Sequence, residues 1–335
     1  MATPQVAMCS HCGTHQAALQ ICSGCVDAPE YQPGDSAETW YCDTGCQRLH
    51  RPVHNARCKQ LQKRRHLLRS ANMLKATITA YRECCAVAVF TKIELVNNVL
   101  HLHVDVEESL ARKWLYPFAE GLTTNTEHKE MALASNQSAV AAFILSGLTF
   151  ALLKGISSQL TKLFVDPKPI LDWKTIPETT LVGPYPPPHV AILVQLRHEH
   201  WVLDVTGCEY GHRETLLPAT KFLEEVARRT RTAWTYAGRE TTDIDVSRGS
   251  VLLRNQRDFW RKELERPLRL HFAAFVKERF GEDAPQNSVK DFLGGTAEEF
   301  QGKLDRYVVD LKQYLAEFVQ RSYEEAMENQ SQQQG

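Results

Sequence analysis

The apolar positions of this chain follow two different periods after residue 58. A run from about Cys58 to Cys85 has helical spacing, whereas residues 86–106 alternate apolar with polar side chains. Alternation favours strand, because successive side chains on a strand point to opposite faces. Helical spacing returns in the C-terminal third, at Phe259, Trp260, Leu264, Leu268, Phe272, Phe275 and Phe280, and again at Phe300, Leu304, Tyr307, Leu311, Tyr314 and Phe318.

The last of these stripes alternates steps of four and three residues. We interpret it as a helix that covers a globular core, with a dimer seam or a partner-binding helix as the alternative. Its heptads are too few to indicate a coiled coil. The glutamine-rich residues 329–335 are predicted to form a disordered tail, since they contain no apolar side chain to bury.

The segment from Met131 to Leu153 contains no charged residue, and its length is compatible with a membrane span. Serine, asparagine, glutamine, glycine and threonine dilute its hydrophobicity, and no flanking aromatic belt or basic cluster marks its ends. We therefore predict a helix buried inside a globular domain. It should begin near Ser135–Ser138, which offers N-cap side chains, and end near Gly155.

Two further strands are predicted at residues 189–194 and 199–206, after a proline-rich lead-in at residues 183–188. If they form a hairpin whose turn is centred between Leu196 and Arg197, His189 lies directly opposite Asp204, with their Cβ atoms about 5 Å apart. The turn has neither glycine nor asparagine, so this register is a hypothesis. His198 and His200 near the turn are expected to be exposed; a metal site there would need a carboxylate beside them.

Composition adds three expectations. With 43% hydrophobic residues, the 335-residue chain can hold a small module and one or two globular units. A net charge of −1 makes nucleic-acid binding unlikely. The exception is a basic cluster between Lys59 and Arg69, with Lys63, Arg64, Arg65 and Arg69. We interpret it as the solvated face of a connecting helix, with a nuclear-import or nucleic-acid patch as the alternative. The first ten residues lack a signal peptide, so we expect a cytoplasmic or nuclear protein without disulfides.

The cysteines are concentrated near the N-terminus, where seven of the ten lie between Met8 and Lys59. Their spacing is C-x2-C, C-x2-C, C-x3-C and then H-x3-C, which is enough for two closed tetrahedral zinc sites. A segment this short and polar buries little apolar surface, so metal binding would supply most of its folding free energy. The eight candidate ligands are Cys9, Cys12, Cys22, Cys25, Cys42, Cys46, His54 and Cys58.

The order of these ligands resembles the MYND-type zinc finger. Residues 41–47 match the aromatic-Cys-x3-Cys-Gln core of that family, and His54 and Cys58 follow as its pattern asks. The resemblance implies a cross-braced arrangement and a groove for a protein or a proline-containing peptide. One structural zinc would be held by Cys9, Cys12, Cys42 and Cys46, and the other by Cys22, Cys25, His54 and Cys58. This chain departs from the family in Arg51, where tryptophan is usual, and in a long stretch from Val26 to Tyr41, interpreted as a surface insertion.

The middle region resembles the transglutaminase-like superfamily more weakly. There, a His on one strand and an Asp on the next serve a Cys at the start of an upstream buried helix; His189 and Asp204 fit the first two roles. The nucleophile position holds Ser138 instead. The resemblance therefore implies an inactive version of the fold, with an acyl-transfer or amide-processing enzyme that uses Ser138, or Cys84 or Cys85, and chance similarity as alternatives.

Other activities find no support in the residues. The Asn-His-x-Cys motif of SET-type methyltransferases is absent, as are G-x-S-x-G and phosphate-binding glycine loops. We therefore predict an α+β protein that acts as a non-catalytic interaction module, with a nuclear transcriptional cofactor as a further alternative. The predicted units are the cross-braced double-zinc finger at 1–60, a connecting helix and strands at 61–130, an α+β core at 131–250, C-terminal helices at 251–328 and the tail at 329–335.

Overall fold

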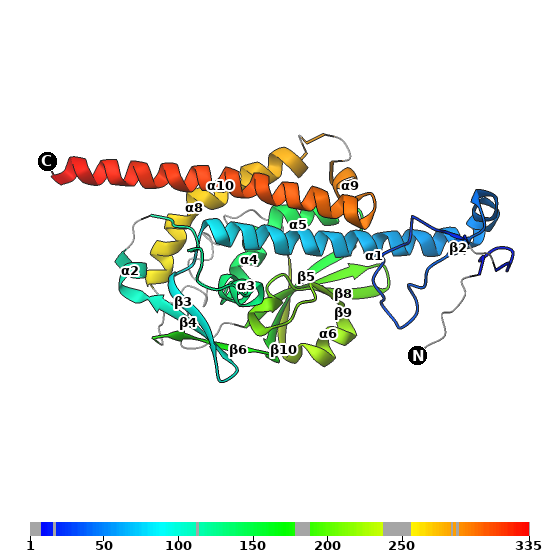
Figure 1. Cartoon of the computed structure of the whole chain (residues 1–335), viewed down its shortest axis with the longest axis horizontal. Coiled ribbons are helices and arrows are strands. Elements are labelled where there is room, and N and C mark those ends of the chain that lie inside the picture. Colours follow the sequence, from blue (N-terminus) through cyan, green and yellow to red (C-terminus); the bar gives the residue numbers. More distant parts are fainter. Residues whose placement is uncertain are drawn as a thin grey trace.

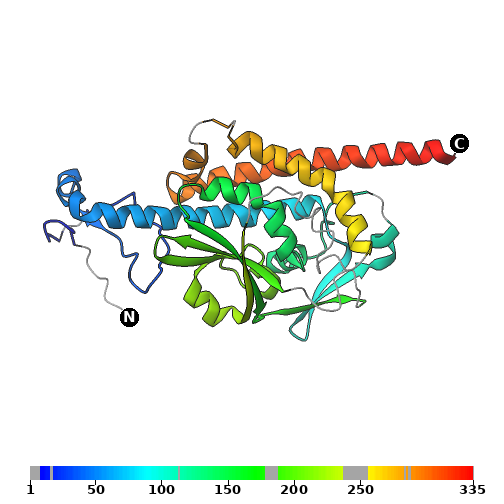
Figure 2. The same cartoon turned by 180° about the vertical axis from the view of Figure 1, so that it is seen from behind.

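Two long helices lie side by side along the molecule, and a five-stranded sheet lies beneath them (Figures 1 and 2). They are α1 (Thr44–Cys84) and α10 (Ala297–Gln334). This arrangement of helices on a sheet, with a small N-terminal module at one end, confirms the predicted mixed α and β class. The computed structural model describes residues 8–15, 18–111, 114–177, 188–236, 256–282, 284–285 and 288–334.

Helix α1 belongs to both the N-terminal module and the body. It begins at Thr44, because the side chain of Asp43 accepts a hydrogen bond from the Cys46 amide at 2.8 Å and so caps the first turn. Its first turns bend away from the rest of the helix (Figure 1). Pro52 accounts for the bend, since proline cannot donate the hydrogen bond of a helix interior. The helix that we predicted to begin near Cys58 thus begins at Thr44.

The five-stranded sheet is antiparallel throughout, in the order β10-β5-β7-β8-β9. One face packs against α1, α4 (Ser138–Ile144) and α5 (Ser146–Leu153) through side chains such as Ile192 and Trp201. The other face packs against the short helix α6. Both faces are therefore covered, which explains the nearly continuous apolar sequence of the central strand. The elements are β5 (Gln159–Pro167), β7 (His189–Leu196), β8 (Glu199–Leu203), β9 (Leu216–Pro218), α6 (Ala219–Glu225) and β10 (Ala227–Thr235).

The β7–β8 hairpin forms as predicted, but its predicted register is wrong. Leu196 pairs with Glu199, so the turn is centred between Arg197 and His198 and the register differs by two residues. Arg197 supplies the left-handed conformation, with φ of 59°, that glycine or asparagine usually provides in such turns. Residues 178–187, which include most of the proline-rich lead-in, lie outside the described residues.

The uncharged segment is buried as predicted, but it forms parts of three helices rather than one. Asn136, with φ of 54°, ends α3 (Thr126–Ala134) and lets the chain turn into α4 (Ser138–Ile144), and α5 (Ser146–Leu153) follows after Leu145. The predicted end near Gly155 is confirmed by its φ of 79°. In the part of the chain that the structure describes, no helix is both long and apolar enough to cross a membrane.

The alternating residues 86–106 form two strands of a second, three-stranded sheet. Strands β3 (Val89–Val96) and β4 (Val99–Asp105) form a hairpin, and β6 (Asp172–Ile176) pairs with β4 in parallel. Asn97 and Asn98, with φ of 51° and 59°, make the two-residue turn. One face packs on α3 through a separate apolar cluster that includes Leu100 and Leu102. The short helix α2 (Val106–Ala111) follows β4.

The C-terminal helices cover the core, as the apolar stripes predicted. In α10 the buried side chains include Phe300, Leu304 and Leu311, and the hydroxyl groups of Tyr307 and Thr77 of α1 lie 3.2 Å apart. Helix α10 continues through Gln334, whereas we expected a disordered tail from residue 329. Glutamine is a good helix former, and no glycine or proline intervenes before Gly335. The other two helices are α8 (Gln256–Phe280) and α9 (Ser288–Leu293).

Candidate metal centre

The first and third cysteine pairs meet in one group. Cys9 and Cys12 lie in a tight turn closed by the Cys9 amide, which donates to the Thr14 carbonyl at 3.0 Å. Cys42 directly follows β2 (Trp40–Tyr41), and Cys46 lies in the capped first turn of α1. The Sγ atoms of Cys12 and Cys42 are 3.5 Å apart, and all four sulfur atoms lie within 4.8 Å of one another.

The second pair and the helical ligands form the other group. Cys22 follows β1 (Gln20–Ile21), and the Cys25 amide donates to the Cys22 carbonyl at 3.1 Å, which makes the turn between them. His54 and Cys58 are one helical turn apart on α1, so both face the same side. The Sγ atoms of Cys22 and Cys58 are 3.8 Å apart, and Cys25 Sγ lies 3.6 Å from His54 Nε2.

The two groups are interleaved along the chain. The first and third ligand pairs form one group and the second and fourth form the other, which is the cross-braced order that the resemblance implied. The antiparallel pairing of β1 with β2 places Ile21 opposite Trp40 and so brings the two halves of the module together. The chain therefore passes through both sites twice, and each site links segments on either side of the other.

The ligand geometry fits zinc. Tetrahedral coordination with Zn–S of about 2.3 Å and Zn–N of about 2.1 Å separates two sulfur atoms by about 3.8 Å, and a sulfur and a nitrogen by about 3.6 Å. The observed separations of 3.5, 3.8 and 3.6 Å agree with these values. All ten cysteines are free, so disulfides do not account for the clustering. Four protein ligands at each site leave no open position, so both zinc ions are structural.

The electrostatics of the two groups also favour a cation. Burial, followed by a hydrogen bond with Cys22, raises the pKa of Cys25 to about 12. A hydrogen bond with Cys12, followed by burial, raises the pKa of Cys42 to about 12. A backbone hydrogen bond with Cys12 instead lowers the pKa of Cys9 to about 6, so the thiols of the first group differ. Thiolates at Cys25 and Cys42 need a positive ion beside them. Burial lowers the pKa of His54, which keeps its imidazole neutral and able to coordinate.

Three residues support the ligands. Gln47 belongs to the core that matched the family pattern, whereas Gln62 and Gly24 were not singled out from the sequence. The side-chain amide of Gln62 donates to Cys58 Sγ at 3.5 Å, and that of Gln47 donates to Cys22 Sγ at 3.9 Å. A Cβ atom on Gly24 would lie 2.8 Å from Cys58 Sγ, so only glycine fits there. The spacing of Gln62, one helical turn after Cys58, is the signal that could have found it.

Comparison with known families assigns this region. Residues 9–58 match the family model of the MYND finger. These residues form a MYND finger. The comparison with curated proteins and the comparison with solved structures each found no match. The assignment of the finger is thus supported by both sequence and geometry. The body is described from its structure alone.

The long stretch between Val26 and Tyr41 is not a free surface insertion, because it packs on the body. Its Asp35 pairs with Arg64 of α1 at 2.7 Å, and the same guanidinium pairs with Glu199 of β8 at 2.6 Å. The Tyr31 ring lies 5.4 Å from the Trp201 ring. The Arg64 side chain is only 7% exposed, so this network fixes the finger against the sheet.

The basic cluster is likewise not a solvated helix face. Besides Arg64, Arg65 donates to the Ser23 carbonyl at 2.8 Å. Arg69 is buried and donates to the carbonyls of Leu293 at 2.8 Å and Gly295 at 2.9 Å. Three of these cations are therefore tied to the finger or to the C-terminal helices, and the charge available to an external partner is small.

The body contains the predicted His–Asp pair. His189 Nε2 lies 2.8 Å from Asp204 Oδ2 even though the register differs from the predicted one. Extending the observed register places Thr206 opposite His189, so Asp204 is a diagonal neighbour on the same face and within side-chain reach. Glu209, which sequence reasoning missed, lies 3.9 Å from His189 Nδ1 and accepts a 2.7 Å hydrogen bond from the Asn136 amide.

This cluster is sealed from solvent. The side chains of His189, Asp204 and Glu209 are 0%, 5% and 1% exposed. Burial acts to lower the pKa of His189, but the attraction of Asp204 outweighs it and the pKa is raised. Burial raises the pKa of Glu209 to about 7. The three titratable side chains therefore interact with one another inside the protein.

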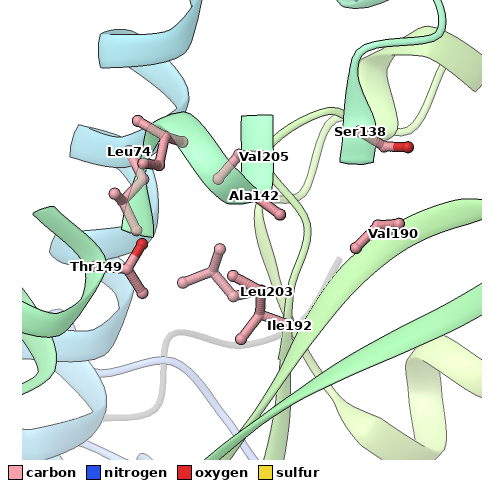
Figure 3. A pocket seen from close by; sticks show the side chains of 9 residues that line it. Leu74, Ser138, Ala142, Thr149, Val190, Ile192, Leu203 and Val205 are labelled. Atoms are coloured by element: carbon pink, nitrogen blue, oxygen red, sulfur yellow. The ribbon is translucent and has the colours of Figure 1, made fainter. Parts of the chain in front are cut away.

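Ser138, the candidate nucleophile, is also buried. It lies at the start of α4 and borders a small cavity lined mostly by aliphatic side chains such as Ala142 and Val190. Figure 3 shows its hydroxyl group directed away from the other lining side chains. The cavity leaves about 10 Å³ for the centre of a water-sized molecule, which is room for one water and not for an acyl group.

Proposed function

We propose that this protein is a non-catalytic interaction protein whose finger captures a proline-containing peptide. The observation that carries the proposal is a pair of exposed apolar side chains on the finger. Leu49 and Val53 lie one helical turn apart on α1 and are 65% and 78% exposed. The ligands Cys46 and His54 hold this part of the helix to the two zinc sites, so the pair is presented on a fixed surface.

The chemistry of the partner follows from this surface. Rigid apolar side chains fit the rings of an extended proline-containing segment, which loses little entropy on binding because it is already ordered. Arg48 and Arg51 are exposed beside the apolar pair, so an acidic residue next to the prolines would add attraction. Arg51, at the position where tryptophan is usual, replaces a flat apolar contact with a charge.

A peptide array tests this proposal. Purified protein is applied to immobilised proline-containing peptides with and without acidic flanks, and the double variant Leu49→Ser/Val53→Ser is compared with Leu95→Ser. Leu95 is also exposed, at 48%, but lies on β3 of the body. We expect the double variant to lose binding at least tenfold while retaining two zinc ions, and Leu95→Ser to bind as the wild type does. Equal binding by the double variant would refute the proposal.

The acyl-transfer alternative rests on the 2.8 Å contact between His189 and Asp204. We propose instead that this pair serves structure, which the burial of both side chains and the small cavity at Ser138 support. Incubation with an amine donor and a glutamine-containing peptide distinguishes the two. We expect no incorporation by the wild type; incorporation that His189→Ala abolishes would establish the enzyme.

The nuclear-cofactor alternative would use Lys63, Arg64 and Arg65 as an import signal. The contacts of Arg64 with Glu199 and of Arg65 with the Ser23 carbonyl support a structural role for both. We propose that the cluster does not direct import. A Lys63→Ala/Arg65→Ala variant should therefore keep the wild-type distribution between cytoplasm and nucleus, and a shift out of the nucleus would favour the cofactor.

A further inference from the structure

The β3–β4 hairpin carries a third group of metal-ligating side chains. Glu94, His101 and His103 place one ligand atom each within 4.8 Å of the others. Glu94 is the direct register partner of His101, and His103 follows two residues later on the same face. His103 Nε2 already lies 2.8 Å from Glu94 Oε1. We propose that these three side chains bind a divalent transition-metal ion, as a site separate from the finger.

The backbone beneath these side chains is well fixed. The opposite face of the hairpin packs into a buried cluster through Ile93, Leu100 and Leu102, which are 6%, 0% and 0% exposed. The two-residue turn at Asn97 and Asn98 sets the register. A one-residue slip would bury the imidazoles and expose the leucines, so the pairing that brings the ligands together is strongly specified.

The ligand set selects the class of ion. Two imidazoles and one carboxylate suit Zn²⁺, Co²⁺, Ni²⁺ or Cu²⁺ better than Mg²⁺ or Ca²⁺, which prefer oxygen ligands. Ligand atoms about 2.1 Å from one ion lie roughly 3 to 3.4 Å apart. Side-chain rotations that move the three ligand atoms by about 1 Å therefore bring them to coordination distance. His103 and Glu94 are 27% and 33% exposed, which leaves room for that rotation and for water at the remaining positions.

Neighbouring lysines make this site weaker than the finger sites. The Lys92 ammonium group lies 2.7 Å from Glu94 Oε2, and Lys174 of β6 is the register partner of His101. Lys92 is 60% exposed, so the ion can displace it into solvent at small cost. We therefore expect reversible binding in the micromolar range, typical of few ligands and an incomplete shell, and not the tight binding of a closed thiolate site.

A second hairpin of this protein provides a matched control. His198 and His200 have the same His-x-His spacing, at the turn between β7 and β8. The carboxylate between them, Glu199, is held by Arg64 at 2.6 Å and by Trp201 Nε1 at 3.0 Å. It is therefore not free to act as a ligand, which is the difference between the two hairpins.

Cobalt titration tests the proposal on the full chain loaded with two zinc ions. One equivalent of Co²⁺ should bind as a third metal ion without a thiolate-to-cobalt charge-transfer band, since this site has no sulfur. Such a band would report exchange into the finger. Isothermal titration with Zn²⁺ gives the affinity. We expect His101→Ala and Glu94→Gln each to weaken binding of the third metal ion at least tenfold. The His198→Ala/His200→Ala variant should leave that affinity unchanged.

Folding of the variants is checked separately, by far-ultraviolet circular dichroism and by the midpoint of thermal unfolding without added metal. Glu94→Gln conserves shape, so it keeps the test valid if a histidine variant unfolds. The proposal is overturned if the wild type binds only two metal ions, if a third binds with thiolate bands, or if folded Glu94→Gln binds the third as tightly as the wild type.

Discussion

The finger and the body are stabilised by different interactions. Five buried apolar residues form the finger cluster, and three of them, Cys9, Cys22 and Cys25, are zinc ligands. The body instead packs leucine, isoleucine and aromatic side chains from two sheets and several helices. The finger therefore depends on metal binding for its structure, whereas the body depends on apolar burial. Arg64 and the shared helix α1 join the two regions.

The largest expected effect comes from removing zinc. Each structural ion contributes a binding free energy on the order of 10 kcal/mol, so a chelator or Cys42→Ser should unfold the finger up to the start of α1. The body should remain folded, because its clusters contain no zinc ligand. Hydrogen exchange measured by mass spectrometry checks this, with Cys208→Ser as the control. Complete exchange in β7 would show that the two regions unfold as one unit.

The second effect tests the ionic contact between the regions. Arg64→Met leaves Asp35 and Glu199 without their cation and should cost about 3 kcal/mol, the lower end for a broken buried pair, since Asp35 is 27% exposed. Adding Glu199→Gln should restore part of the loss. Chemical denaturation of the wild type, Arg64→Met and the double variant measures the loss of unfolding free energy and its partial recovery. An additive result, without recovery, would contradict coupling across this contact.

A third effect belongs to the body alone and depends on pH. The folded-state pKa of Glu209, about 7, exceeds its unfolded value, so the carboxyl group holds a proton in the native state that the unfolded chain has released. Stability should therefore fall as pH rises from about 5 to 7, by up to about 1.4 kcal/mol per pH unit. The pKa of His189 is also raised, so its contribution to stability changes in the same direction. That contribution is lost above pH 6.5, as pH rises through the folded-state pKa.

The measurement is denaturant unfolding at several pH values, monitored by tryptophan fluorescence, to which the buried Trp201 contributes. Glu209→Gln should flatten the curve below pH 7. Zinc loss in acid destabilises the finger in the opposite direction, so the wild type is compared in excess zinc and the lower pH limit is set at 6. A slope unchanged by Glu209→Gln would assign the dependence to other groups.

The smallest effect concerns the support of one ligand in the finger. Gln62→Leu removes the hydrogen bond to Cys58 Sγ and should weaken zinc binding at the second site about tenfold, with no effect on the stability of the body. Competition with a chromophoric chelator measures the affinity. Gln60→Leu, two residues away on α1, is the control. Equal zinc affinity in the two variants would show that the Gln62 contact does not tune the site.

The ligands were predictable because their geometry is local. A C-x2-C pair converges through a single turn, and His54 and Cys58 converge through one turn of helix, so spacing alone identifies them. The contacts of Arg64 were not, since Glu199 is 135 positions away in sequence. Nothing in the basic cluster distinguishes a buried guanidinium from a solvated one before the sheet is placed beside it.

The body shows the same division. The strands were predicted from their periods, but their register depends on a turn whose left-handed residue is Arg197, a residue that rarely adopts this conformation. The division of the uncharged segment depends on Asn136, and here a signal existed, because asparagine tolerates positive φ better than most residues. Glu209 joins His189 only through the fold, from the short 3-10 turn at Gly207–Tyr210.

The continuity of α1 has a mechanical consequence. From Cys58 to Cys84 the helix spans about 40 Å, at about 1.5 Å per residue. Cys58 is a zinc ligand at one end, and the other end is buried in the body through its own side chains Leu74, Ile78 and Tyr81. A peptide bound near Leu49, as we propose, would therefore be held by a rigid helix and not by a flexible tether. The orientation of the body would then set the direction from which the peptide approaches.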